Sequence, residues 1–362
     1  MKKKFLALIV LLPVLVVFLA GCATGLTASA WPGIATDSEA AYVAGGPYVY
    51  AVNTQTGVEL WRFPGKASTA YPFYAVPLLT DDGQLIFGGF DHKLYSLDPS
   101  LPAEVYKTEP EKAQNWVFEG AHDHYIGSVL VAGDMVYAPN SDYHLYAVSL
   151  ASGSLQWSFK ADQSLWAAPA TDGANVYFGT LGGKVYALDA QTGELVWKTV
   201  ADSAVLGSPV VKNGLVYVTT YSGSLVALDA ASGAIRWNKP LAGRVWSGPL
   251  LDGDSLYFGD ANGNLYAFDL DGNLVWQQAL KGAVVGSPLI KNGVLVAGTD
   301  LGNVYFINVA SQERDLVPVS GKVFASPAAA GTMFLVAPTD GDILLIALDQ
   351  TGAQKWVFTP AK

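Results

Sequence analysis

Two stretches of the sequence read Tyr186-Ala-Leu-Asp-Ala-Gln-Thr-Gly-Glu-Leu-Val-Trp197 and Val226-Ala-Leu-Asp-Ala-Ala-Ser-Gly-Ala-Ile-Arg-Trp237. Their last residues belong to the series Trp157, Trp197, Trp237 and Trp276, with spacings of 40, 40 and 39 residues. A fixed period of about 40 residues, with several short β patterns and a glycine-bearing turn in each unit, is typical of propeller blades. The sequence therefore predicts a repeat array.

One unit, residues 206–239, shows how each blade is expected to be built. Its short apolar runs are separated by the dipeptides Asn213-Gly214, Ser222-Gly223 and Ser232-Gly233. Such dipeptides between alternating runs form hairpin turns. Each unit is therefore predicted to be a four-stranded antiparallel meander.

The outermost strands number eight. Their tryptophans are Trp61, Trp116, Trp157, Trp197, Trp237, Trp276 and Trp356, whereas the seventh copy, near Asp315 and Leu316, has lost its tryptophan and its turn glycine. We expect these tryptophans to be structural, because a ring packed between blades buries about 150–250 Å² and its N–H needs only one partner. The predicted fold is an all-β, eight-bladed β-propeller over residues 31–358, with a loosely packed outer strand in blade seven.

The N-terminus differs in character from the repeats. Three lysines at positions 2–4 precede an apolar run that ends at Ala20, contains Pro13 and is shorter than the roughly 20 residues of a spanning helix. Residues 1–21 therefore predict a signal peptide. Its end, Leu19-Ala20-Gly21-Cys22, resembles the bacterial lipobox, so Cys22 is the predicted lipidation site and residues 22–30 form a lipidated tether.

This anchor predicts an exported protein. In a cell with two membranes it would lie on the periplasmic face of the outer membrane, and in a cell with one membrane on the outer face of the plasma membrane. Cys22 is the only cysteine, which excludes an intrachain disulfide and a thiolate metal cluster. Removal of residues 1–21, which hold three Lys and no acidic residue, changes the formal net charge from −10 to −13 and argues against nucleic acid as a partner.

The repeated Ala-Leu-Asp-x-x-Thr-Gly-x-x-x-Trp phrase resembles the pyrroloquinoline quinone (PQQ) repeat with its tryptophan-docking motif, and the resemblance covers nearly all of Trp31 to Phe358. Eight such blades behind a lipobox resemble the lipoproteins of outer-membrane barrel assembly. The resemblance implies a non-catalytic, monomeric scaffold that binds protein partners in the cell envelope. In those lipoproteins an N-terminal strand completes the last blade. Here the chain ends with a complete strand, Lys355-Trp-Val-Phe358, so side-chain packing is expected to close the ring.

Two other functions remain open at this stage. One is a glycan-binding, ligand-binding or sensor module at the cell surface, and the other is a degenerate PQQ-dependent dehydrogenase. Enzymes of the resembling fold hold the cofactor with long insertions, an adjacent-cysteine disulfide and a calcium ion. This sequence has one insertion, between Leu97 and Trp116, and no Gly-x-Ser-x-Gly, His-Glu-x-x-His or Gly-Lys-Ser/Thr motif. It therefore predicts no cofactor, no catalytic residue and no enzyme.

Two stretches of the sequence contain side chains that bind metals in other proteins. Asp260-Ala-Asn262-Gly-Asn264 resembles the start of a calcium loop, but Leu265 stands where that loop has glycine, so a hairpin turn is expected. His122 and His124 offer two imidazoles, yet no further Cys or His is close in sequence. No metal site is predicted, and these histidines are instead candidates for a polar binding surface.

The residue three positions before the proline of each innermost strand, or its equivalent, is aromatic in the even-numbered blades only. These residues are Ser29, Tyr74, Ile126, Trp166, Leu206, Trp246, Val285 and Phe324. They either ring one mouth of the axial channel, where aromatic and Arg side chains would bind a protein, peptide or glycan, or act as wedges between blades. The candidate partner-binding rim is Tyr74, His122, His124, Tyr125, Trp166, Arg244, Trp246, Lys322 and Phe324. A rival contact surface is the blade-two insertion, expected on the opposite face.

Overall fold

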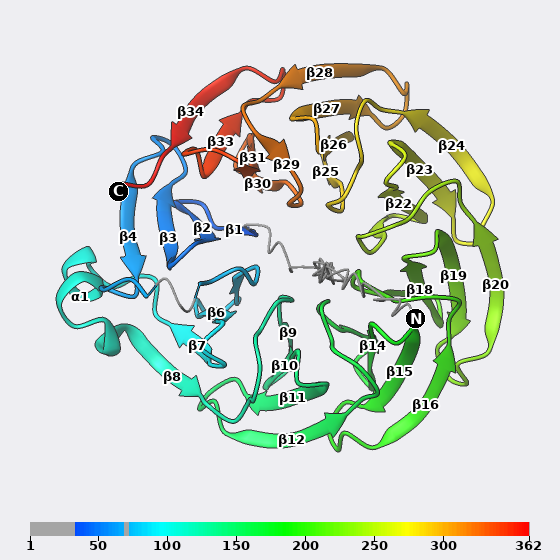
Figure 1. Ribbon diagram of the computed structural model, residues 1–362, viewed down its shortest axis with the longest axis horizontal. Helices are drawn as coiled ribbons and strands as arrows, with labels where there is room; N and C mark the ends of the chain where they lie inside the picture. Colours follow the sequence, from blue (N-terminus) through cyan, green and yellow to red (C-terminus); the bar gives the residue numbers. More distant parts are fainter. Residues whose placement is uncertain (1–32, 69–71, 362) are drawn as a thin grey trace, which may run out of the picture.

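The computed structural model describes residues 33–68 and 72–361, whose strands form a closed ring of eight four-stranded antiparallel sheets (Figure 1). The predicted fold class is confirmed. Cys22, the tether and Ser29 lie outside the described residues.

In the first four blades, consecutive strands pair as hairpins. Blade one contains β1 (Ile34–Thr36), β2 (Ala40–Gly45), β3 (Tyr48–Asn53) and β4 (Glu59–Phe63). Blade two contains β5 (Leu78–Leu79), β6 (Leu85–Gly88), β7 (Leu94–Leu97) and β8 (Gln114–Phe118). Blade three contains β9 (Leu130–Ala132), β10 (Met135–Pro139), β11 (His144–Ser149) and β12 (Leu155–Lys160). Blade four contains β13 (Ala170–Thr171), β14 (Asn175–Gly179), β15 (Lys184–Asp189) and β16 (Leu195–Val200).

The last four blades repeat this order. Blade five contains β17 (Val210–Lys212), β18 (Leu215–Thr220), β19 (Ser224–Asp229) and β20 (Ile235–Pro240). Blade six contains β21 (Leu250–Asp252), β22 (Ser255–Gly259), β23 (Asn264–Asp269) and β24 (Leu274–Ala279). Blade seven contains β25 (Leu289–Lys291), β26 (Val294–Gly298), β27 (Asn303–Asn308) and β28 (Arg314–Pro318). Blade eight contains β30 (Ala328–Ala330), β31 (Met333–Val336), β33 (Leu345–Leu348) and β34 (Gln354–Phe358), while β29 (Lys322–Val323) pairs with β32 (Pro338–Thr339).

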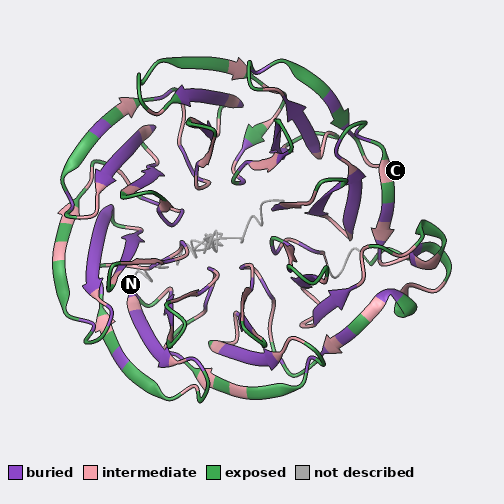
Figure 2. Ribbon diagram, turned by 180° about the vertical axis from the view of Figure 1, so that it is seen from behind, coloured by how far each residue is buried: buried purple, intermediate pink, exposed green. Residues whose placement is uncertain are grey.

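The hydrophobic core lies between neighbouring blades. The two middle strands of each blade are almost wholly buried, whereas the outermost strands are largely exposed (Figure 2). One core cluster, for example, joins Tyr177 and Val185 of blade four to Val216 and Val226 of blade five. Both faces of a middle strand pack against a neighbour, which explains their near-continuous runs of Val, Leu, Tyr and Ala.

The repeated tryptophans join each blade to the next. The Trp197 Nε1–H donates to the Ala230 carbonyl at 2.8 Å, and the ring covers Gly233, where an added Cβ would lie 2.6 Å from the indole. Gly233 also has a φ of +72°, so the turn requires glycine for both its conformation and this contact. The same pair of contacts joins the following residues: Trp116 to Leu150 and Gly153, and Trp157 to Ala190 and Gly193.

The same docking closes the ring. The Trp356 Nε1–H donates to the Thr54 carbonyl at 2.8 Å, and its ring covers Gly57. On the axial side, the Thr36 hydroxyl donates to the Ala329 carbonyl at 2.7 Å. Each of these two blades has four strands of its own within residues 33–68 and 328–358, so closure by side-chain packing, as expected, joins them.

The blade-two insertion is more ordered than the predicted loop. It contains the helix α1 (Ala103–Thr108) and the 3-10 helix η1 (Pro110–Ala113), on the outside of the ring (Figure 1). Tyr106 of α1 is fully buried and stacks on Trp61 with ring centroids 4.0 Å apart. The Trp61 Nε1–H donates to the Pro99 carbonyl at 3.2 Å. Tyr106 therefore covers the tryptophan that a turn glycine contacts in other blades.

Blade seven replaces the missing tryptophan in another way. Asp315 pairs with Phe306 in the register where other blades pair tryptophan with a small residue. Phe306 and Val317 fill the space over Gly352 of blade eight. In blade seven itself, Gln312 adopts the positive φ, +62°, of the lost turn glycine. No residue of β28 is fully buried, but the same is true of β12 and β20, which keep their tryptophan, so burial does not test the predicted loose outer strand.

Replacing Trp197 by Ala tests whether the tryptophans are structural. The change removes a ring that is only 8% exposed and leaves a cavity over Gly233. We expect the free energy of unfolding, measured by denaturant titration, to fall by about 3–5 kcal/mol. The control is Leu195→Ala on the same strand, where the side chain is 44% exposed and the expected change is below about 0.5 kcal/mol. Equal losses in the two variants would contradict the docking role.

Candidate functional site

The residues that precede each innermost strand, which we call entry segments, line the axis of the ring. The predicted unit begins at Leu206, but its first strand, β17, begins only at Val210. Pro209 has no N–H to donate, and the segment before it does not pair with a strand. The entry segments instead alternate between residues buried among the blades and residues that face the axis.

The residue just before each predicted ring residue packs between two blades and acts as the wedge. These residues are almost completely buried: Tyr125, Leu165, Val205, Val245, Val284 and Val323. Tyr125 packs against Gly88, and burial raises its pKa well above the usual value of tyrosine. The prediction that Tyr125 belongs to an exposed rim is therefore corrected, since its side chain lies in the core.

The predicted ring residues surround one axial cavity of about 580 Å³. Seven of the eight lie within the described residues, and all seven line it: Tyr74, Ile126, Trp166, Leu206, Trp246, Val285 and Phe324. The volume falls in the range of about 300–1,000 Å³ of ligand sites, and the lining is mainly apolar with serine hydroxyls between the aromatic and aliphatic side chains. The geometry favours the ring over the wedge interpretation.

Close backbone contacts keep the centre of the ring narrow. A Cβ on Gly207 would lie 1.8 Å from the backbone nitrogen of Gly248, and one on Gly127 would lie 2.7 Å from the Trp166 carbonyl oxygen. Neighbouring entry segments thus touch backbone to backbone. The small residues after each ring position make this approach possible, and they leave the larger ring side chains facing the cavity.

Two aromatic clusters stand at the mouth of the cavity. On blades two and three, Phe90 packs edge-on against Tyr74 at 5.0 Å and stacks on His124 at 4.4 Å. On blades five and six, Tyr221 packs edge-on against Trp246 at 5.0 Å, and the Arg244 guanidinium lies 5.3 Å from the Tyr221 ring centroid. Sequence reasoning missed Phe90 and Tyr221. They occupy the turn between the second and third strands, and aligning these turns across the blades would have shown them.

Hydrogen bonds between turns and entry segments hold the mouth in place. In each of several blades, the N–H of a wedge residue donates to the turn of the preceding blade. Examples are Leu165 to Asn140 at 3.2 Å, Val205 to Thr180 at 3.1 Å, Val284 to Asp260 at 3.0 Å and Val323 to Thr299 at 3.0 Å. The mouth is therefore a continuous backbone network, which presents its side chains on a fixed frame.

The stretch at Asp260 is a turn, as expected. The buried Asp260 carboxylate accepts backbone bonds from Asn262 at 2.9 Å and Asn264 at 2.8 Å, and a bond from the Tyr266 hydroxyl at 2.8 Å. Burial and this bond raise the pKa of Tyr266 to about 12. Since protein donors fill its acceptor positions, this carboxylate serves to fix the turn.

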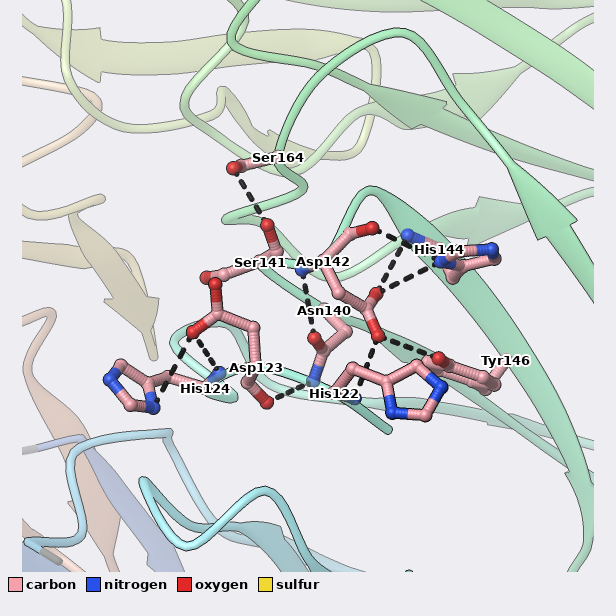
Figure 3. Close-up of polar contacts among 9 residues, drawn as sticks. All are labelled: His122, Asp123, His124, Asn140, Ser141, Asp142, His144, Tyr146 and Ser164. Atoms are coloured by element: carbon pink, nitrogen blue, oxygen red, sulfur yellow. Dashed lines mark hydrogen bonds and ion pairs between the residues drawn. The ribbon is translucent and has the colours of Figure 1, made fainter. Parts of the chain in front are cut away.

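The remaining rim candidates lie at the mouth and differ in their exposure and contacts. Lys322 is exposed and forms an ion pair with Asp340 at 3.0 Å. His122 is exposed, and its backbone N–H donates to the Asp142 carboxylate at 2.9 Å (Figure 3). His124 is partly buried against Phe90. The blade-two insertion lies in a connection between third and fourth strands, on the face opposite the mouth.

Replacing Trp166 and Trp246 together by Ala separates a cavity lining from a structural wedge. Both side chains are only partly buried, so we expect a small fall in melting temperature, far below that of Trp197→Ala. Differential scanning calorimetry of the purified protein measures it. A fall as large as that of Trp197→Ala would mean that both residues hold the blades together.

Comparison with known proteins agrees with the propeller fold. A family model described as outer membrane protein assembly factor BamB matches residues 45–271 and 152–316. No curated protein sequence matches the chain. Among the described residues, no helix is both long and apolar enough to cross a membrane.

Solved structures share the fold at low sequence identity. BamB from Moraxella catarrhalis is 20% identical with a TM-score of 0.68, and the match covers 87% of this chain and 92% of that one. The computationally designed Ika8 protein is 13% identical with a TM-score of 0.71, over 91% and 96% of the two chains. Sqt1 from Saccharomyces cerevisiae is 12% identical with a TM-score of 0.67, over 79% and 85%.

The family match spans most of the blades, and it coincides with the tryptophan-docked repeats that build the ring. The chain belongs to the family described as outer membrane protein assembly factor BamB.

Proposed function

We propose that this protein is a non-catalytic scaffold of the bacterial cell envelope that binds protein partners during outer-membrane protein assembly. It is exported, monomeric and anchored by lipid on Cys22. The family to which the chain belongs supports this proposal, because its description names an assembly factor.

The single observation that carries the proposal is the apolar axial cavity with aromatic clusters at its mouth. Aromatic and Arg side chains on a fixed frame lose little conformational entropy on binding, and they dominate the energy of protein interfaces. The cavity could receive an apolar side chain of a partner, while Arg244 and Tyr221 contact its polar backbone.

The charges of the protein fit a protein partner better than a nucleic acid. The formal net charge of −10 would repel the phosphates of a nucleic acid. At the mouth, the Arg244 guanidinium lies 5.3 Å from the Tyr221 ring centroid. A lipid anchor at Cys22 would hold the propeller close to the membrane where barrel proteins assemble.

Crosslinking in intact cells, followed by purification of the tagged protein, tests this function. We expect a component of the barrel-assembly machinery to be recovered with the wild type. The Trp166→Ala/Trp246→Ala variant should recover at least about tenfold less, because two central aromatic contacts are lost.

The matched control is Glu104→Ala with Lys107→Ala, two exposed side chains of α1 on the opposite face. Deleting residues 100–113 is unsuitable, because it would remove the buried Tyr106. Recovery should match the wild type in this control. Capture that depends on α1 and not on the cavity would refute the proposed site, and recovery of a cell-wall polymer in place of protein would favour the glycan-binding alternative.

A further inference from the structure

All four histidines of the chain, His92, His122, His124 and His144, lie in blades two and three. Two of them meet at the mouth with a carboxylate. Ligand atoms of His92, Asp123 and His124 all lie within 4.8 Å of one another. His92 belongs to the turn between β6 and β7, whereas the other two belong to the connection from β8 to β9.

The backbone around this cluster is fixed from both sides. The Tyr125 N–H donates to the Gly89 carbonyl at 3.3 Å, which ties the β8–β9 connection to the β6–β7 turn. The Asn140 side-chain amide donates to the Asp123 carbonyl at 2.9 Å (Figure 3). Phe90 stacks on the His124 imidazole with an interplanar angle of 6°. The two backbone segments that carry the three side chains are therefore held next to each other.

One nitrogen of the cluster makes no hydrogen bond. His124 Nδ1 is shielded from solvent and has no hydrogen-bond partner among the described residues, and its ion pair with Asp123 Oδ1 is long, at 3.6 Å. A buried polar nitrogen without a hydrogen bond costs about 1–3 kcal/mol. A cation shared by this nitrogen and the Asp123 carboxylate would remove that cost.

We propose that His92, Asp123 and His124 form a binding site for a divalent transition metal of the zinc type. Two imidazole nitrogens and one carboxylate oxygen are a donor set that Zn²⁺ prefers, at about 2.0–2.2 Å from the metal. Such ligand atoms lie about 3.3 Å apart in a tetrahedron. The side chains are partly exposed, so small rotations close the gap. A three-ligand site keeps a fourth position open to water or to a donor from a bound partner.

The site differs from the pair of histidines that the sequence offers. His122 is exposed and lies outside the cluster. The His144 ring nitrogen contacts the Asp142 carboxylate at 3.2 Å, and that carboxylate also accepts the Tyr146 hydroxyl at 2.6 Å (Figure 3). His92, 30 positions or more away in sequence, supplies the missing ligand. The nearby Lys93 ammonium is paired with Glu119 and so does not repel a cation at full strength.

Isothermal titration of the purified protein, without a histidine tag, with Zn²⁺ tests the proposal. We expect one ion to bind per chain and His92→Asn to weaken binding at least about tenfold, because it removes one of three ligands. His92 has a φ of +66°, a conformation that asparagine tolerates well, so this variant should keep the turn. Circular dichroism verifies that it is folded.

The matched control is His122→Asn, the same substitution two positions from His124 and outside the cluster. It should change the affinity less than about twofold. Absence of Zn²⁺ binding by the wild type would overturn the proposal, and so would an equal loss in His92→Asn and His122→Asn. The titration contains no partner protein, so its result is independent of the crosslinking experiment.

Discussion

The contact between a tryptophan and the turn of the next blade is the interaction on which this ring depends. A blade cannot bury both faces of its sheet by itself, so it packs against its neighbours. The indole of one blade covers the turn between the third and fourth strands of the next blade. The contact joins a hydrogen bond, such as Trp197 to the Ala230 carbonyl, to close packing on Gly233. Most blades supply one tryptophan and one turn glycine to this contact, so these residues recur once per repeat of about 40 residues.

This arrangement separates stability from recognition. The tryptophans reach the turns between third and fourth strands, on one face of the ring. The mouth of the axial cavity is built on the other face, from entry segments and from turns between second and third strands. Residues such as Phe90, Tyr221 and Arg244 can therefore differ between blades without weakening the docking contacts.

The repeat made the architecture predictable, because the sequence of each blade contains the same pattern of turns and apolar runs. It also located the axial positions, since Trp166 and Trp246 recur in register. The residue beside them was harder to place. Tyr125 is aromatic like its neighbours on the rim, but alternation along the entry segment turns it into the core. The partner of His124 was not predictable either, because His92 approaches it only through the folding of two loops. Likewise, no sequence pattern predicted that Tyr106 stacks on Trp61.

Ring closure by side chains has a mechanical consequence for blade eight. Blades that follow one another in the sequence are also linked by the chain, whereas within the described residues blades eight and one are joined by non-covalent contacts such as Trp356 on Gly57. The neighbouring junction, between blades seven and eight, has Phe306 and Val317 in place of a tryptophan. Within the described residues, blade eight thus lies between a junction held by non-covalent contacts and a junction without a docking tryptophan. We therefore expect thermal or mechanical unfolding to begin with the opening of the ring at blade eight and to proceed from there to the neighbouring blades.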